Sequence, residues 1–230
     1  MDRIWFPDSV AFSPAYILKV FRIFINKYGT KIVLNHRLFQ KAREMWVCAV
    51  FSLALTKATG KRFWLSAVNN DTTPDVYAFS WQPHPKIKDA NIADRVSIEV
   101  TEWDSHSPDD LVGSVLRKKI AKAYPEYYNV LVYVKRYSQK TNLEDIFQQL
   151  KKLPIKVSEI NLLSSVVGLQ KDNHMAVCLY PKRFAVNFSL KEEEDKDTTT
   201  QVRRMSYGNN SSKPTLEPFI LKLPDINELI

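Results

Sequence analysis

The chain has 230 residues, of which 45% are hydrophobic and 25% charged, enough to build a full core in one domain, with or without an appendage. Five glycines and twelve prolines exclude a collagen-like or low-complexity chain. The net charge is +8, and six basic against eight acidic residues in 191–230 leave +10 on residues 1–190. A basic body favours a polyanion such as nucleic acid as partner, although basic charge also serves solubility alone.

The sequence predicts a cytoplasmic protein in a reducing compartment, with no membrane partner. Its first residues lack the basic start and apolar run of a signal peptide. No apolar run approaches the length of about 18 residues that a membrane span needs. Cys48 and Cys178 both lie in apolar runs, which is typical of reduced core thiols rather than of a disulfide or a zinc site.

Two helices are predicted before the first strand. Ser13-Pro14 is a typical helix start, with Ser as the N-cap, and Gly29 ends the helical periodicity. Asn35 is a second N-cap candidate, after which helical spacing runs from residue 36 to about residue 58. The second half of this helix is apolar nearly all round, as expected of a buried helix.

The rest of the body alternates between strands and helices. Period-2 segments and turn signals predict strands, and period-3.6 segments predict helices. The predicted strands are 63–68, 75–81, 95–103, 129–135, 157–167, 174–180 and 184–190, and the predicted helices are 111 to about 124 and 141–153. The order helix, strand, strand, strand, helix, strand over residues 35–135 predicts an α/β core with a mixed sheet.

The predicted elements divide the chain into three regions. Residues 1–190 are predicted to form the α/β domain. Residues 191–214 are charged and then rich in Thr, Asn and Ser, which indicates a flexible linker. Residues 215–230 regain apolar side chains and are a candidate docking segment for a protein partner.

Two acidic residues stand out on the first three predicted strands. Asp75 begins the second strand and Glu99 lies within the third, on the face opposite Ile98 and Val100. A carboxylate in so apolar a strand is costly unless it is paired or bound to a cation. An Asp and a Glu on adjacent strands can bind Mg²⁺ or Mn²⁺ through their oxygens. Alternatively, Asp75 serves the turn and Glu99 lies on a solvated sheet face.

Two further side chains are candidates to reach this pair. Glu44 lies on an otherwise apolar line of the second helix, so it either snorkels to solvent or has a function. On the helix from residue 111, Lys119 lies within about 20° of the centre of the apolar face, given 100° per residue. Lys118 and Lys122 point further from that face, so Lys119 is expected to point toward the sheet.

Pro74-Asp75, the later strand with Glu99-Val100-Thr101 and the element order together resemble the PD-(D/E)xK nuclease superfamily, which includes restriction endonucleases. The resemblance covers about residues 36–135. It implies a restriction-endonuclease-like core (α-β-β-β-α-β) in which Asp75 and Glu99 hold the metal. The family lysine two residues after the second acid is Thr101 here. This departure implies either a site that has lost catalysis or a lysine supplied by the following helix.

The variant is similar to the cap-snatching endonuclease domain of segmented negative-strand RNA virus polymerases. That resemblance implies a site of His36, Asp75, Glu99 and either Lys118 or Lys119. Glu44 or His36 would complete the shell of Mg²⁺ or Mn²⁺.

The function expected from this resemblance is metal-dependent hydrolysis of phosphodiester bonds in DNA or RNA. One alternative is a catalytically inactive protein of the same fold that binds nucleic acid or a protein partner. A structural protein of a virus or mobile element is a third possibility.

Overall fold

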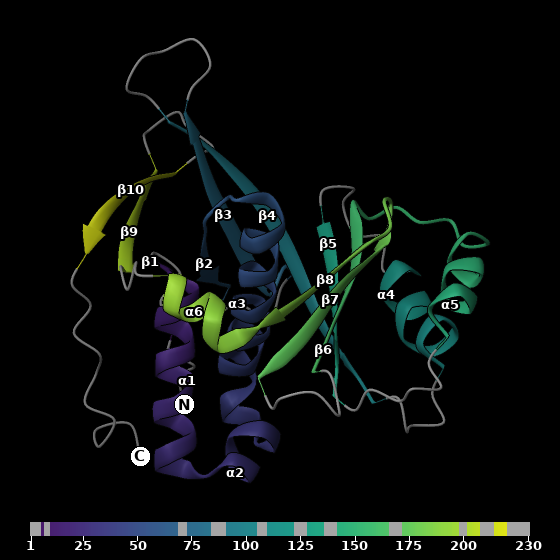
Figure 1. Cartoon of the computed structure of the whole chain (residues 1–230), viewed down its shortest axis with the longest axis horizontal. Coiled ribbons are helices and arrows are strands. Elements are labelled where there is room, and N and C mark those ends of the chain that lie inside the picture. The colour runs from purple at the N-terminus through teal and green to yellow at the C-terminus, as the bar shows by residue number, and fades with distance from the viewer. Residues whose placement is uncertain are drawn as a thin grey trace.

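The computed structural model describes residues 6, 10–68, 73–83, 91–104, 110–121, 128–135, 142–165, 172–197, 202–207 and 214–219. Within them the chain forms an α/β protein with a mixed, open sheet (Figure 1). The helical elements are α1 (Pro14–Tyr28), α2 (Thr30–Asn35), the 3₁₀ turn η1 (Arg37–Phe39), α3 (Gln40–Thr59), the π-helical η2 (Leu111–Leu116), α4 (Arg117–Ala121), α5 (Leu143–Leu150) and α6 (Leu190–Lys196).

The described strands all belong to one sheet, in the order β10-β9-β1-β2-β3-β4-β5-β6-β7-β8. They are β1 (Val10–Phe12), β2 (Phe63–Ala67), β3 (Val76–Pro83), β4 (Asn91–Trp103), β5 (Tyr128–Val134), β6 (Glu159–Ser165), β7 (Asn173–Tyr180), β8 (Phe184–Ser189), β9 (Val202–Tyr207) and β10 (Pro214–Phe219). The β4–β5 and β5–β6 pairs are parallel and the other pairs antiparallel. Parallel pairs need crossovers, and η2 with α4 lies on the first and α5 on the second.

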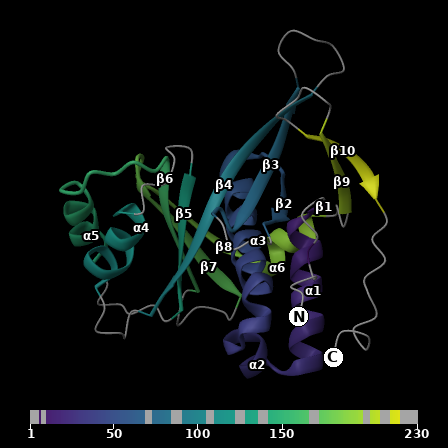
Figure 2. The ribbon, with the colours of Figure 1, turned by 180° about the vertical axis from the view of Figure 1, so that it is seen from behind.

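Helices cover both faces of the sheet (Figures 1 and 2). On one face α1 and α3 form a core with alternate residues of the strands, Leu131 of β5 among them. On the other face η2 and α5 form a second core with Val130 and Val132 of the same strand. The alternation along β5 shows why so apolar a strand occurs there: both of its faces are buried.

The first helix forms as its sequence predicts. The hydroxyl of Ser13 accepts a 3.2 Å hydrogen bond from the Tyr16 amide, and Pro14 occupies the first turn. Gly29 ends the helix at a φ of 81°, a conformation that costs glycine little.

The start of the second helix differs from its prediction. Residues 30–35 form the short helix α2, and His36, not Asn35, caps the turn that follows by accepting from the Leu38 amide. The Asn35 side chain instead donates to the Lys31 carbonyl at 2.8 Å. That bond ties Asn35 to the end of α2, so its side chain is engaged away from the turn that follows.

Residues 191–214, predicted as a flexible linker, contain most of α6 and all of β9. Ser189 caps α6, and β9 pairs antiparallel with β1 along Val10–Phe12. The acidic run was interpreted as solvated charge, but Glu193 is buried against α3 and bound by lysines. Residues 198–201, 208–213 and 220–230 lie outside the described residues, so most of the candidate docking segment does too.

The two cysteines are both buried and free, as the sequence predicts. None of the described helices is long and apolar enough to cross a membrane.

Candidate functional site

Asp75 immediately precedes β3, at the edge of the β3–β4 pairing. Beyond this point β4 continues without β3 as its neighbour. Its amide donates to the Ile98 carbonyl at 3.0 Å, and its Oδ2 accepts from the Val100 amide at 2.8 Å. The carboxylate thus accepts the hydrogen bond from the Val100 amide that a backbone carbonyl would accept if β3 began earlier in the chain. We call this position beside the start of β3 the notch. Because the Asp75 carboxylate lies near the plane of the sheet there, side chains from both faces can reach it.

From the α3 face, Lys41 and Glu44 reach the notch. The Lys41 ammonium lies 2.5 Å from Glu44 Oε2, 3.7 Å from Asp75 Oδ1 and 3.3 Å from the Asp75 carbonyl oxygen, to which it donates. Gln40 donates to the other Glu44 oxygen at 2.9 Å. Lys41 and Glu44 are both buried. Burying both charges is tolerable because each neutralises the other.

From the opposite face, Glu99 and Lys119 reach the same region. Glu99 projects from β4 toward α4, where Lys119 Nζ donates a 2.7 Å hydrogen bond to its Oε1. The Glu99 side chain is 6% exposed and that of Lys119 19%. Burying an unpaired carboxylate is costly, and Lys119 pairs with this one.

The three carboxylates influence one another electrostatically. Burial, followed by the charges of Glu44 and Glu99, raises the pKa of Asp75 to about 6, while Lys41 and the Val100 amide act in the opposite direction. Burial and the charges of Asp75 and Glu44 also raise the pKa of the nearby Cys48 thiol. Asp75 is therefore the member of the cluster on which charge from both faces converges.

The structure brings Asp75, Glu99, Glu44 and Lys119 to one region. It does not bring His36 there: that side chain is exposed and caps η1. Lys118 is also exposed, on a different side of α4 from the bond between Lys119 and Glu99.

Lys41 is the residue that the sequence analysis misses. It lies three residues before Glu44 and seven before Cys48, so it shares their line on α3. Following the apolar line backward from Glu44, and not only forward, would have found it. A Lys and a Glu at this spacing on a buried line indicate an internal ion pair.

In the described residues, no three His, Cys, Asp or Glu side chains are arranged around a single point in the manner of a metal shell. Lys41 and Lys119 each hold one of the flanking carboxylates, on opposite sides of Asp75. The described cluster contains three carboxylates and two ammonium groups, so its acidic charge is only partly balanced.

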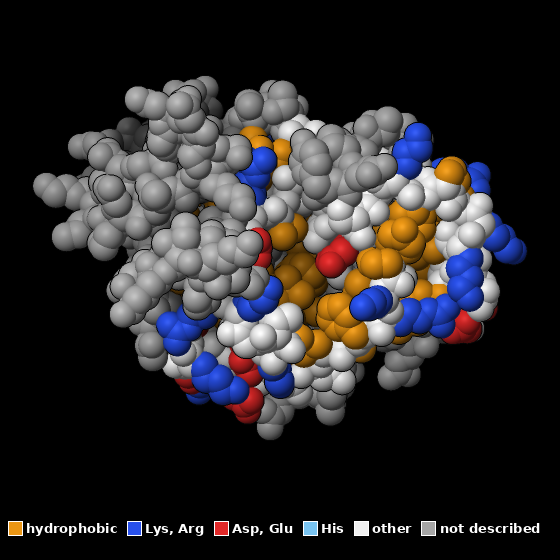
Figure 3. Space-filling view, turned by 90° about the horizontal axis from the view of Figure 1, so that it is seen from above, with side chains coloured by type: hydrophobic (Ala, Val, Ile, Leu, Met, Phe, Trp, Pro, Cys, Tyr) orange, Lys and Arg blue, Asp and Glu red, His pale blue; other side chains and the backbone are white. Residues whose placement is uncertain are grey.

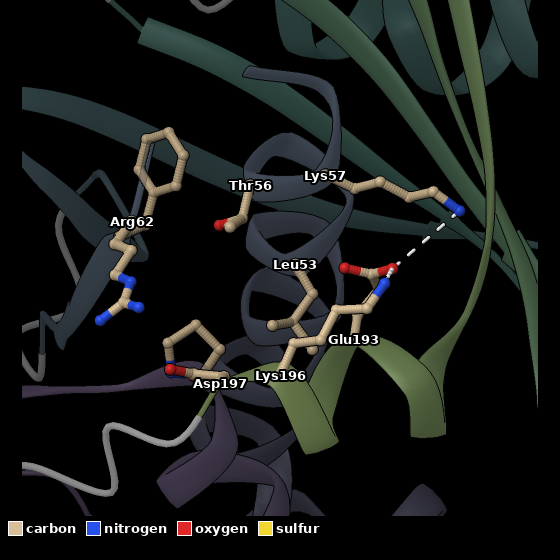
Figure 4. A pocket seen from close by; sticks show the side chains of 9 residues that line it. Leu53, Thr56, Lys57, Arg62, Glu193, Lys196 and Asp197 are labelled. Carbon is tan, nitrogen blue, oxygen red and sulfur yellow. Dashed lines mark hydrogen bonds and ion pairs between the residues drawn. The ribbon is translucent and has the colours of Figure 1, made fainter. Parts of the chain in front are cut away.

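Two cavities lie away from this cluster. One, of about 250 Å³, opens between α3, the start of β2 and α6, and Figure 4 shows Lys57 and Lys196 turned toward Glu193 in it. The other, of about 440 Å³, is lined by α5 and the end of β7 with the turn after it, including Phe147, Leu179 and Arg183. On the α5 side, Figure 3 shows hydrophobic side chains in a hollow with Lys and Arg around it.

Comparison with family models, curated proteins and solved structures finds no match to this chain. The features of this chain that bear on its function are therefore the carboxylate–lysine cluster and the order of the elements that carry it.

Proposed function

We propose that this chain is a metal-dependent nuclease of the PD-(D/E)xK type that hydrolyses phosphodiester bonds in DNA or RNA. The observation that carries the proposal is the meeting of three acids from α3, β3 and β4 with a lysine from the helix after β4. Each acid is costly to bury, and together they make a strongly anionic, oxygen-rich position.

The arrangement of elements supports the same proposal. From α3 to β5 the order is helix, three antiparallel strands, helical crossover and a parallel strand. This order resembles that of a restriction-endonuclease-like core. In that family, acids of the second and third strands hold the metal, and Asp75 at the start of β3 and Glu99 within β4 would be their counterparts.

The donor set fits Mg²⁺ or Mn²⁺, which prefer carboxylate oxygens. Asp75 and Glu99 would hold the ion. Glu44, which Lys41 holds on the α3 side, would have to turn toward them to become a third ligand. The exposed cap His36 is not placed to join them. A bound ion would polarise the scissile phosphate and lower the pKa of the attacking water.

Lys119 would take the part that a lysine at position 101 plays in the family. The hydroxyl of Thr101 carries no charge, but Lys119 brings an ammonium to the same carboxylate from α4. It keeps Glu99 oriented and places positive charge where negative charge develops on the phosphate. The +10 charge of residues 1–190 would hold the nucleic-acid backbone.

The second candidate is a non-catalytic nucleic-acid-binding protein of the same fold. The observation that favours it is the pairing of Lys41 with Glu44, since an acid already neutralised within the protein needs no metal. The two candidates share the binding surface and differ only in catalysis.

The test compares the wild-type chain with Asp75→Asn, with Mn²⁺, on single- and double-stranded DNA and RNA. The nuclease proposal requires cleavage by the wild type and at least about 100-fold less by the variant, because general metal assistance is worth several kcal/mol. Equal cleavage by both proteins identifies a contaminant. No cleavage by either, with nucleic-acid binding retained, supports the second candidate.

A further inference from the structure

The Lys41 ammonium occupies a position lined by oxygen atoms. Glu44 Oε2, Asp75 Oδ1 and the Asp75 carbonyl oxygen lie 2.5, 3.7 and 3.3 Å from its nitrogen. All three belong to the proposed metal ligands Glu44 and Asp75, and two of them are carboxylate oxygens. The ammonium therefore sits where a cation bound by Glu44 and Asp75 would experience the greatest attraction.

The position is built into the helix and does not arise from a chance surface contact. Lys41 is in the first turn of α3, and its side chain is 8% exposed. Gln40, its neighbour, fixes the other oxygen of Glu44. A buried ammonium on a flexible four-carbon stem can leave such a position without unfolding the helix.

We propose that Lys41 is a resident counter-ion that competes with the divalent metal for Glu44 and Asp75, so that it lowers the metal affinity of the site. This rests on the proposed function, because it assumes that these acids bind metal. In the metal-free protein Lys41 neutralises the acids and keeps the fold stable. When metal binds, the ammonium swings away from Glu44, and the acids exchange one cation for another.

The same contacts allow the opposite role, in which Lys41 positions Glu44 and Asp75 for the metal. The two roles predict opposite changes when the ammonium is removed. A competitor, once removed, leaves tighter metal binding; a positioning residue, once removed, leaves weaker binding.

The experiment measures Mn²⁺ binding by calorimetry and the Tm with and without Mn²⁺. It compares the full-length wild type, Lys41→Met and Lys41→Gln. Lys118→Met is the matched control, because it removes the same charge from an exposed position outside the cluster. Competition predicts at least about 10-fold tighter Mn²⁺ binding in both Lys41 variants and less than about 2-fold change in the control. It also predicts a lower Tm without metal and a larger Tm gain on adding Mn²⁺.

Each outcome decides the question. Equal or weaker Mn²⁺ binding by folded Lys41 variants overturns the competition and leaves the metal site standing. If Lys118→Met gains as much Mn²⁺ affinity as the Lys41 variants, the loss of net charge alone explains the gain, and the competition proposal is also overturned. If neither the wild type nor the variants bind Mn²⁺, the proposed metal site itself fails, and the competition fails with it.

Discussion

Lys119 Nζ and Glu99 Oε1 are joined by a 2.7 Å hydrogen bond that connects α4 to the middle of β4. The bond spans the crossover between two parallel strands, so it depends on the fold and not on sequence proximity. It gives the buried Glu99 carboxylate a positively charged partner. It also gives α4 a fixed position over the sheet.

Replacing Lys119 with Met should abolish Mn²⁺-dependent cleavage, by about 100-fold or more, because the site then lacks the positive charge that Thr101 does not supply. Nucleic-acid affinity should change by less than about 3-fold, since one partly buried charge contributes little to phosphate contacts. Rates under single-turnover conditions and a binding titration measure the two effects.

Lys118→Met is the matched control for that substitution. Lys118 is exposed on the same helix, so its removal should weaken binding slightly and leave the cleavage rate of bound substrate unchanged. A Lys118 variant that loses cleavage as completely as the Lys119 variant would contradict the assignment of Lys119.

The pKa of Asp75, raised to about 6 by burial and by Glu44 and Glu99, predicts how stability depends on pH. A carboxyl whose pKa is higher in the folded state binds its proton more tightly there. Its contribution to the free energy of unfolding is therefore largest below about pH 4 and falls as pH rises through 6, by on the order of 2–3 kcal/mol. Chemical denaturation from pH 4 to 7 measures this.

Asp75→Asn is the control for this pH dependence. The amide does not titrate, so the difference in unfolding free energy between wild type and variant should change across the same pH range. A difference that stays constant from pH 4 to 7 would show that Asp75 has an ordinary pKa. For the same reason, Mn²⁺ affinity of the wild type should decrease below pH 6, where protons compete for Asp75.

The charge of residues 1–190 predicts strongly salt-dependent binding of nucleic acid. With several phosphate contacts, affinity should fall about 10²- to 10³-fold or more between 50 and 200 mM salt. Filter-binding or anisotropy titrations at several salt concentrations measure the slope. An affinity that is flat over this range would remove nucleic acid as the partner, whether or not the site is catalytic.

The ion pairs of the buried Glu193 indicate that α6 stabilises the fold. It is buried and lies 2.9 Å from the Lys196 ammonium and 4.0 Å from that of Lys57 on α3. Glu193→Gln should lower the free energy of unfolding by about 1–3 kcal/mol because two lysines lose their shared anion. The exposed neighbour Glu192→Gln should change it by less than about 0.5 kcal/mol. Equal losses would mean that α6 is not packed as described.

The parts of the fold that the sequence predicts well are those marked by local chemistry. The Ser13-Pro14 cap and Gly29 are enough to predict where α1 begins and ends, and the apolar run at 129–135 predicts the strand β5. α6 shows the limit of this reasoning. Its acidic residues look solvated in sequence, and only the position of Lys57, over a hundred residues earlier, makes one of them a buried partner.

The site residues also differ in whether local sequence patterns or long-range contacts determine their positions. Strand alternation and helical angle are local, and they placed Glu99 and Lys119 on facing sides. The pairing of Lys41 with Glu44 is local to α3, but its contact with Asp75 depends on the start of β3 lying beside the first turn of α3, which no local pattern contains. His36 was a candidate through resemblance alone, and its local chemistry as a helix cap determines its place instead.

The pairing of β1 with β9 has a consequence for synthesis. Residues 10–12 lie against residues 202–204, so the chain must leave the ribosome as far as residue 204 before β1 gains this neighbour. Until then the nascent protein carries an open backbone edge at its own beginning, next to a sheet that is otherwise ready to form. Such an edge can capture a strand from another chain. Chains that stop short of residue 202 should thus be the ones that associate with each other during translation.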